Sequence, residues 1–269
     1  MRLAFRGFPC ALTALMVMVC AAPARAQAEP ESARPGVEFL PRTAFHMAAE
    51  HIFDDDPRFV WDADFGGELD FVDYGWGRAT FEANYQLVLG QEIRAFDPNQ
   101  GNYMLSGLVS ARVRGIEMAA QFYHQSRHLA DRSKEEAIDW NMVGGRVRRS
   151  FAISRATVDA RADLRGVVMK TTVDYSWELD AGVRSDVKVH PRVGLLAAAD
   201  LRYLGVDGSR DRGNQAGYKV EGGVRFEGHA GAIELFVTGE RRIDPFPLEA
   251  GTAQWLAAGF RLLSRSPGR

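Results

Sequence analysis

The sequence predicts an all-β chain that forms a transmembrane antiparallel up-and-down β-barrel of about 12 strands. Two observations lead to this fold class. Apolar and polar residues alternate over long segments, and the connections between those segments are alternately short and long. The segments run for about ten residues, which suits a tilted strand that crosses a membrane better than a strand of a soluble β-sandwich or lipocalin-like barrel.

Alternation is clearest from Trp61 to Phe71, where every odd position is apolar or glycine and every even position is acidic or glycine. Because successive strand residues point to opposite faces, one face of this segment is apolar and the other is charged. The same pattern predicts strands at 44–52, 58–71, 76–90, 103–113, 116–128, 138–150, 156–167, 173–187, 192–205, 216–228, 231–242 and 252–264. All 11 prolines lie outside these spans, as expected for strands that are paired on both sides.

The start of the chain has the pattern of a secretory signal peptide. A basic beginning precedes an apolar run at 11–22, and the small residues at 24–26 suit a cleavage site. Cys10 and Cys20, the two cysteines of the chain, lie in this segment, so we expect no disulfide in the exported protein.

We therefore expect a signal peptide at 1–26, an N-terminal periplasmic lead at 27–43, one barrel domain at 44–264 and a tail at 265–269. Removing the signal peptide takes three arginines from 33 basic residues and leaves 30 against 35 acidic ones, a net charge of −5. That balance does not suggest a nucleic-acid partner. The expected location is the cell outer membrane, with its lipids as the surrounding medium.

The connections predict how the barrel is oriented. Short ones fall near 72–75, 114–115, 189–191 and 228–230, and longer polar ones fall at 91–102, 129–137, 206–215 and 243–251. Outer-membrane barrels have short periplasmic turns and longer outer loops, so both ends of this barrel are expected in the periplasm. The closing sequence "AAGFRLL" resembles the C-terminal signal of such proteins, which implies the barrel assembly machinery as a partner.

The stretch "QFYHQSRHLADR", from Gln121 to Arg132, carries the candidate chemistry. Continuing the parity of Phe122, the side chains of His124, Ser126 and His128 face the lipid near the outer end of their strand. Alternate residues of one strand face have Cα atoms roughly 6.6 Å apart, which allows a histidine and a serine to form a hydrogen bond. This is the spacing of a general base and a nucleophile.

The next predicted strand supplies a third polar group. If the hairpin is centred on 132–133, His124 lies opposite Asn141 and Ser126 lies opposite Asp139. Asn141 would then face outward and could hold the imidazole tautomer. A slip of one residue in the register would separate these groups.

On these residues the chain resembles two lipid-hydrolysing families. "YHQS", from Tyr123 to Ser126, is similar to the Tyr-x-His-x-Ser-Asn-Gly stretch of outer-membrane phospholipase A, a twelve-stranded barrel. The resemblance implies Ser126 as nucleophile, His124 as base and Asn141 as its partner, with calcium and a homodimer. Lipid A deacylase also has an outward His-x-Ser, with a glutamate in the third role. Glu136 or Asp139 would take that role here.

A second resemblance covers more of the stretch. "HQSRHLAD", from His124 to Asp131, is similar to the His-x-Ser-Ser-His-Leu-Gly-Asp stretch of an uncharacterised family of outer-membrane barrels, and it implies the fold without an activity. The chain departs from the phospholipase pattern at Arg127 and His128, where that family has Asn-Gly. Arg127 could still offer a backbone N–H to an oxyanion.

Three other interpretations of the polar residues stay open. Tyr, His and Ser near the rim of a barrel also form ordinary polar and aromatic girdles without catalysis. The acidic run at 54–56 suits a solvated turn better than a divalent-cation site. Charged residues predicted to face the lumen would plug it when paired and line a small-solute channel when unpaired. They are Asp62, Asp64, Glu68, Asp70, Arg78, Glu82, Arg146, Arg148, Arg161 and Arg165.

Overall fold

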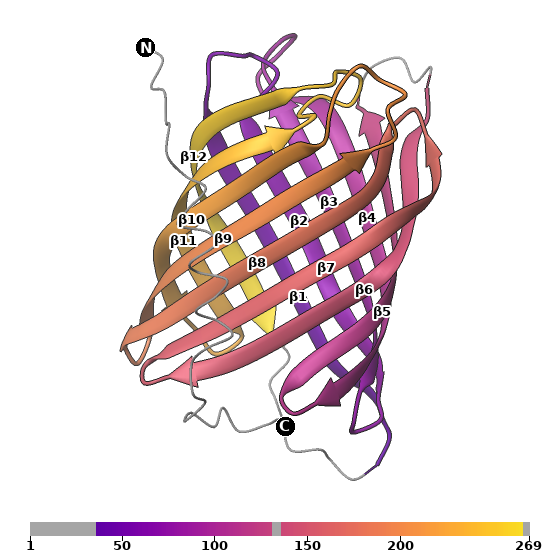
Figure 1. The fold of residues 1–269 in the computed structure, drawn as a ribbon. Helices are drawn as coiled ribbons and strands as arrows, with labels where there is room; N and C mark the ends of the chain where they lie inside the picture. The colour runs from indigo at the N-terminus through magenta and orange to yellow at the C-terminus, as the bar shows by residue number, and fades with distance from the viewer. Residues whose placement is uncertain (1–35, 131–135, 266–269) are drawn as a thin grey trace.

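The computed structural model describes residues 36–130 and 136–265, and in it the chain forms a closed antiparallel barrel (Figure 1). The strands are β1 (Glu38–Phe53), β2 (Trp61–Asp73), β3 (Arg78–Gly90), β4 (Asp97–Val113), β5 (Ile116–Leu129), β6 (Ile138–Ile153), β7 (Ala156–Thr171), β8 (Tyr175–His190), β9 (Val193–Val206), β10 (Gln215–Glu227), β11 (Gly231–Ile243) and β12 (Thr252–Arg265). The predicted fold class is confirmed. The predicted signal peptide, and most of the predicted tail, lie outside the described residues.

Two strands begin earlier than the alternation predicts. β1 begins at Glu38 and contains Pro41, and β4 begins at Asp97 and contains Pro98. The prediction that every proline lies outside a strand is therefore wrong at these two positions. Each proline lies at a register shift, one between Phe39 and Arg42 and the other opposite Leu89, where the ladder tolerates a missing N–H.

Pairing of the first strand with the last closes the barrel. Residues from Ala44 to Phe53 of β1 pair with residues from Arg265 back to Leu256 of β12. The segment of β1 before Ala44 pairs with β2 alone. In consequence no strand of the described barrel is left as an open edge.

The connections separate the barrel into a turn end and a loop end. The turn end carries the short connections at 74–77, 114–115, 154–155, 191–192 and 228–230, and the start of β1 and the end of β12 lie there too. The loop end carries the connections at 54–60, 91–96, 130–137, 172–174, 207–214 and 244–251. The expected alternation of lengths fails once, because 172–174 is a short connection at the loop end.

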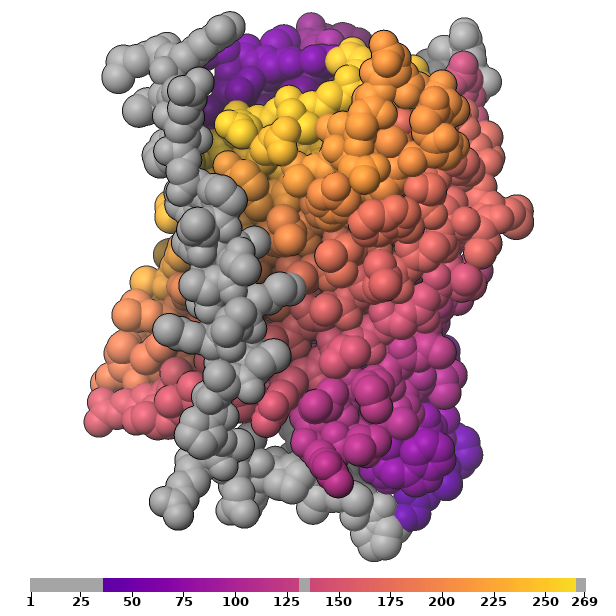
Figure 2. All heavy atoms as spheres, in the orientation of Figure 1, coloured from indigo at the N-terminus to yellow at the C-terminus, as the bar shows by residue number. Residues whose placement is uncertain are grey.

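Large apolar side chains cover the outside of the barrel. Exposed residues on the strands include Phe45, Phe81, Phe122, Val143, Val147, Leu164, Leu195, Val220, Leu235, Val237, Leu256 and Phe260. In the space-filling view the strands facing the viewer form a continuous outer wall (Figure 2). No helix among the described residues is long and apolar enough to cross a membrane. An apolar exterior around a closed sheet requires lipid rather than water.

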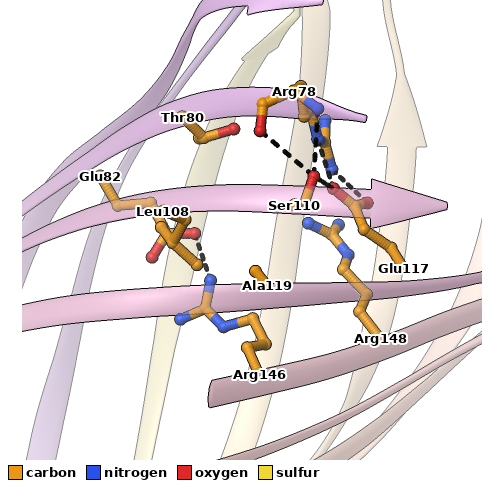
Figure 3. A pocket seen from close by; sticks show the side chains of 9 residues that line it. All are labelled: Arg78, Thr80, Glu82, Leu108, Ser110, Glu117, Ala119, Arg146 and Arg148. Carbon is orange, nitrogen blue, oxygen red and sulfur yellow. Dashed lines mark hydrogen bonds and ion pairs between the residues drawn. The ribbon is translucent and has the colours of Figure 1, made fainter. Parts of the chain in front are cut away.

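Charged side chains line the inside, and the ten residues predicted to face the lumen do so. Most of the ten form ion pairs, as the plugged interpretation expects. At the turn end, the Arg78 guanidinium binds both oxygens of Glu117 at 2.7 and 2.8 Å (Figure 3). Arg146 bridges Glu82 at 2.5 Å and Asp163 at 2.6 Å.

Glu234 on β11 is the most heavily paired carboxylate of the lumen. Its side chain is fully buried and lies 2.6 Å from Arg184, 2.9 Å from Arg225 and 2.6 Å from Arg261. These arginines come from β8, β10 and β12, so this one group links four strands. Arg225 is buried and the other two arginines are partly buried, and taking such groups out of water is costly unless a carboxylate compensates them.

We expect Glu234→Gln to lower the free energy of unfolding by roughly 1.5–3 kcal/mol, because it removes the fully buried carboxylate that three arginines share and leaves each of them with one other carboxylate. Glu227→Gln is the matched control, since Glu227 also binds Arg225 but is far more exposed, and it should cost at most about 1 kcal/mol. Urea unfolding of the refolded barrel, followed by tryptophan fluorescence, measures both. Equal losses in the two variants would contradict the assigned role of Glu234.

Candidate functional site

The candidate site lies on the outward face of β5, near its loop end. Tyr123, Gln125 and Arg127 line the lumen cavity, so the alternate residues His124 and Ser126 face outward. Phe122, which lies two residues before His124 on the same face, is half exposed. The parity predicted for this stretch is confirmed.

The register between β5 and β6 is also the predicted one. His124 pairs with Asn141, and Ser126 pairs with Asp139. His124 Nδ1 lies 2.9 Å from Asn141 Oδ1, a hydrogen-bond distance between side chains of neighbouring strands. Because the amide oxygen only accepts, the imidazole donates from Nδ1 and its Nε2 is left as a base.

Ser126 has a partner that the sequence analysis did not predict. Its Oγ lies 3.2 Å from His128 Nε2, and no hydrogen bond between the described residues joins it to His124. His128 has the same parity as His124 and Ser126, so the alternation that located the first histidine also signals the second. The predicted triad residues are therefore gathered on one face, with Ser126 turned toward the other histidine.

Neither acidic candidate for the third role is bonded to His124 among the described residues. Asp139 is directly opposite Ser126 in the ladder, and Glu136 precedes the first residue of β6 and is exposed. The side-chain hydrogen bond of His124 goes to Asn141. Geometry therefore favours the amide over either carboxylate as the group that orients this imidazole.

A row of aromatic rings leads across the outer surface to the site. Phe65, Tyr85 and Tyr103 are cross-strand neighbours on β2, β3 and β4, and Tyr103 is in turn paired with Ser126. Ring centroids are 5.9 Å apart in the first pair and 4.7 Å in the second. Tyr103 then meets the His128 ring edge-on at 5.4 Å. The serine thus sits at the end of an aromatic wall.

Arg127 points away from this face. Its guanidinium donates to the backbone oxygen of Asp244 at 2.7 Å, to Gln100 Oε1 at 2.9 Å and to the backbone oxygen of Pro245 at 3.2 Å. The Arg127 side chain, at the asparagine position of the phospholipase pattern, therefore makes its hydrogen bonds inside the barrel.

Calcium needs several oxygen ligands around one point. In the described part of the chain no group of three or more His, Cys, Asp or Glu residues is placed to hold a metal ion. The described residues do not fit a carboxylate-rich calcium site within one chain.

The lumen is a second candidate site. A cavity of about 940 Å³ runs inside the barrel. Its lining extends from Gln100 and Pro245 near the loop end to Arg42 and Ser264 near the turn end. Acidic and basic groups line it in nearly equal number, so its walls favour neither cations nor anions.

The connection at 244–251 lines the lumen at the loop end and is bound there by Arg127 and Gln100, and we call it the cap. Arg212, from the connection at 207–214, binds Asp174 at 2.5 Å and Asp244 at 2.7 Å. The Tyr175 hydroxyl donates to Asp244 at 2.7 Å. Three loop-end connections are thereby joined through one guanidinium.

Burial raises the pKa of Asp244, but donors to its carboxylate outweigh this effect and hold the pKa below the ordinary value of 3.8. The donors are Arg212, the Tyr175 hydroxyl and the backbone N–H of Gly251. Hydrogen bonds that Arg212 donates to the carboxylates of Asp174 and Asp244 raise the pKa of its guanidinium in turn. The Asp244 carboxylate and the Arg212 guanidinium are therefore both ionised, and their ion pair holds the cap in place.

Comparison with solved structures returns outer-membrane barrels. An outer-membrane channel from Pseudomonas putida F1 has a TM-score of 0.53 at 11% identity, covering 91% of this chain and 99% of that one. The calcium-bound outer-membrane phospholipase dimer from Salmonella typhi has a TM-score of 0.51 at 10% identity, covering 83% and 91%. Outer-membrane phospholipase A from Escherichia coli gives 0.51 at 10% identity, covering 83% and 97%.

The chain has the fold of the integral outer-membrane β-barrels. At 10–11% identity the likeness extends to the fold alone. Neither a protein-family model nor a curated protein sequence matches the chain. Together with the apolar outer surface, the fold indicates the cell outer membrane as the location of the protein.

The cap should loosen in acid. A carboxylate whose pKa is lowered by folding stabilises the folded form above its ordinary pKa, and that stabilisation is lost as the pH falls through the lowered value. We therefore expect hydrogen exchange at 244–251, corrected for intrinsic rates, to stay slow above pH 3.8 and to accelerate below it.

In Asp244→Asn, exchange at 244–251 should already be fast at neutral pH, because the variant lacks the carboxylate. Protection of the cap that is the same in both proteins at every pH would contradict the role given to Asp244.

Proposed function

We propose that the protein is a lipid acyl ester hydrolase whose site is Ser126, His124 and Asn141 on the lipid-facing side of β5. The observation that carries the proposal is the 2.9 Å contact between His124 Nδ1 and Asn141 Oδ1, two residues along the strand from an outward serine. A side-chain amide holding a histidine beside a serine on the lipid-facing side of a barrel suits chemistry on a lipid substrate.

The proposed reaction is acyl transfer in two steps. Ser126 Oγ forms a bond with the ester carbonyl carbon while His124 Nε2 takes the hydroxyl proton. The carbon–oxygen bond to the lipid alcohol then breaks, and His124 returns the proton to the departing oxygen. Water attacks the acyl-serine by the same route and releases a fatty acid. Asn141 accepts from Nδ1–H throughout and stabilises the imidazolium.

The position of the site on the barrel suits this substrate. Ser126 lies three residues before the end of β5 at the loop end, which the loop lengths predict to be the outer end. An ester of an outer-leaflet lipid lies at that depth, between the acyl chains and the head group. Tyr103 and the aromatic row beside it offer a flat apolar surface to the acyl chain.

The partners of the site belong to the same proposal. One similar solved structure is a calcium-bound phospholipase dimer, and a homodimer of this chain is proposed on that likeness. Among the described residues no three His, Cys, Asp or Glu side chains are grouped to hold a metal ion, and the proposed steps do not use calcium. Recognition of β12 by the barrel assembly machinery is proposed from the sequence of that strand.

We expect the refolded protein in detergent to release fatty acid from phospholipid or lipopolysaccharide. Ser126→Ala and His124→Ala should each lower the rate by at least about 10³-fold, because each removes a reacting group. Asn141→Ala should lower it by about 10- to 100-fold, because the base loses its orientation. Liberated fatty acid, measured with and without calcium, gives the rates.

Two variants serve as controls for this test. Ser185→Ala removes another outward serine, on β8, and should leave the rate unchanged. Asp139→Asn keeps the size of the residue opposite Ser126 and should leave most of the activity, whereas a loss as large as that of His124→Ala would transfer the third role from Asn141 to Asp139. Wild-type protein that cleaves neither lipid would refute the hydrolase.

The lumen supports a second candidate function, a small-solute conduit closed by the cap. The cavity of about 940 Å³ favours a conduit, because it offers space for a small solute. The ion pair of Arg212 with Asp244 holds the cap in place and so opposes opening of the loop end. The backbone N–H of Asp244 donates to Gly251 O at 2.8 Å, so the two ends of the cap already meet. A two-residue turn can therefore replace 245–250 without moving β11 or β12.

With Asn-Gly in place of 245–250, we expect conductance steps in planar bilayers, whereas the intact protein should be silent at neutral pH. The change removes residues 245–250 of the cap, keeps the ion pair of Asp244 with Arg212 and leaves the strands paired. Silent bilayers with the shortened protein would show that the charged network, rather than the cap, closes the lumen, and the conduit would be abandoned.

A further inference from the structure

Ser126 lies between two histidines of the same face, and each histidine is held differently. His124 is fixed through Nδ1 by Asn141, and His128 is 3.2 Å from the Ser126 hydroxyl through Nε2. Positions two residues before and after a strand residue are each roughly 6.6 Å away along one face, so both rings can reach the same hydroxyl.

The His128 ring is held on its other side by aromatic packing. Tyr103 meets it edge-on, with centroids 5.4 Å apart and planes at 80°. Gly101 is the cross-strand partner of His128, and a Cβ there would come within 2.4 Å of the Tyr85 hydroxyl. The absence of a side chain at this position leaves space for the rings of Tyr85 and Tyr103 beside the histidine.

The directions of the hydrogen bonds restrict what His128 can do. A serine hydroxyl has one proton to donate, and it accepts through its lone pairs. His124 donates from Nδ1 to Asn141, so its Nε2 can only accept in the neutral ring. For Ser126 to give its proton to His124, the contact with His128 must be one in which the serine accepts.

We propose that His128 is a positioning residue of the hydrolase site, whose Nε2–H donates to Ser126 Oγ and turns the hydroxyl proton toward His124. The inference rests on the proposed function. In the attack step the serine proton passes to His124 Nε2 and the serine oxygen bonds to the acyl carbon. His128 neither gains nor loses a proton. It stands where the phospholipase pattern has glycine, so this chain would hold its nucleophile in its own way.

Two substitutions test the N–H donor and the aromatic ring of His128 separately. His128→Phe keeps an aromatic ring against Tyr103 and removes the N–H, and His128→Gln keeps an N–H donor and removes the ring. We expect His128→Phe to lower kcat by about 10- to 100-fold with KM within about twofold, the loss for one hydrogen bond that orients a reacting group. His128→Gln should recover most of kcat.

A second measurement does not depend on activity. The ¹⁵N spectra of the histidine rings in detergent should show His128 as the Nε2–H tautomer and His124 as the Nδ1–H tautomer, assigned by their loss in His128→Phe and His124→Ala. His128→Phe as fast as wild type, His128→Gln as slow as His128→Phe, or a neutral His128 protonated on Nδ1 would each overturn the inference.

Failure of the inference is distinguishable from failure of the hydrolase. If the protein releases fatty acid and loses that activity in Ser126→Ala, but His128→Phe has no effect, only the proposed role of His128 is refuted. If wild-type protein releases no fatty acid from either lipid, the proposed hydrolase activity is refuted, and the positioning role of His128 is refuted with it.

Discussion

The barrel depends on one constraint, the pairing of every strand in an apolar medium. Lipid offers no hydrogen-bond partner, so an open sheet edge would leave a row of backbone groups unsatisfied. β1 and β12 meet over ten residues of each strand, and this contact turns the sheet into a ring. Once the ring is closed, each side chain has only two directions, toward lipid or toward the lumen.

These two directions determine the chemistry of both faces. The inward face brings acidic and basic groups together, and Glu234 with its three arginines is the strongest case. The outward face is apolar except near its ends, so a His and a Ser there stand out. The contact of His124 with Asn141 requires the β5–β6 register, because a shift of one residue would turn the amide toward the lumen.

Local patterns were predictable from the sequence, and distant contacts were not. Alternation located the strands except where Pro41 and Pro98 interrupt it at bulges. Counting residues outward from the assumed centre of the β5–β6 connection placed Asn141 opposite His124. The cap was missed, because Arg127 and the backbone oxygen of Asp244 are 117 residues apart. Parity placed His128 on the same face, but its contact with Ser126 was not predicted, because the resemblance directed attention to His124 as the base.

The placement of Ser126 on the lipid side is the claim on which the hydrolase rests. Residues 27–269 contain no cysteine, so single cysteines at 125 and 126 can carry nitroxide labels in the refolded protein. In lipid bilayers the label at 126 should relax strongly with oxygen, which dissolves in lipid, and weakly with a water-soluble nickel reagent. The label at 125 should show little oxygen effect. The opposite result, with 125 in lipid and 126 in the lumen, would contradict the account.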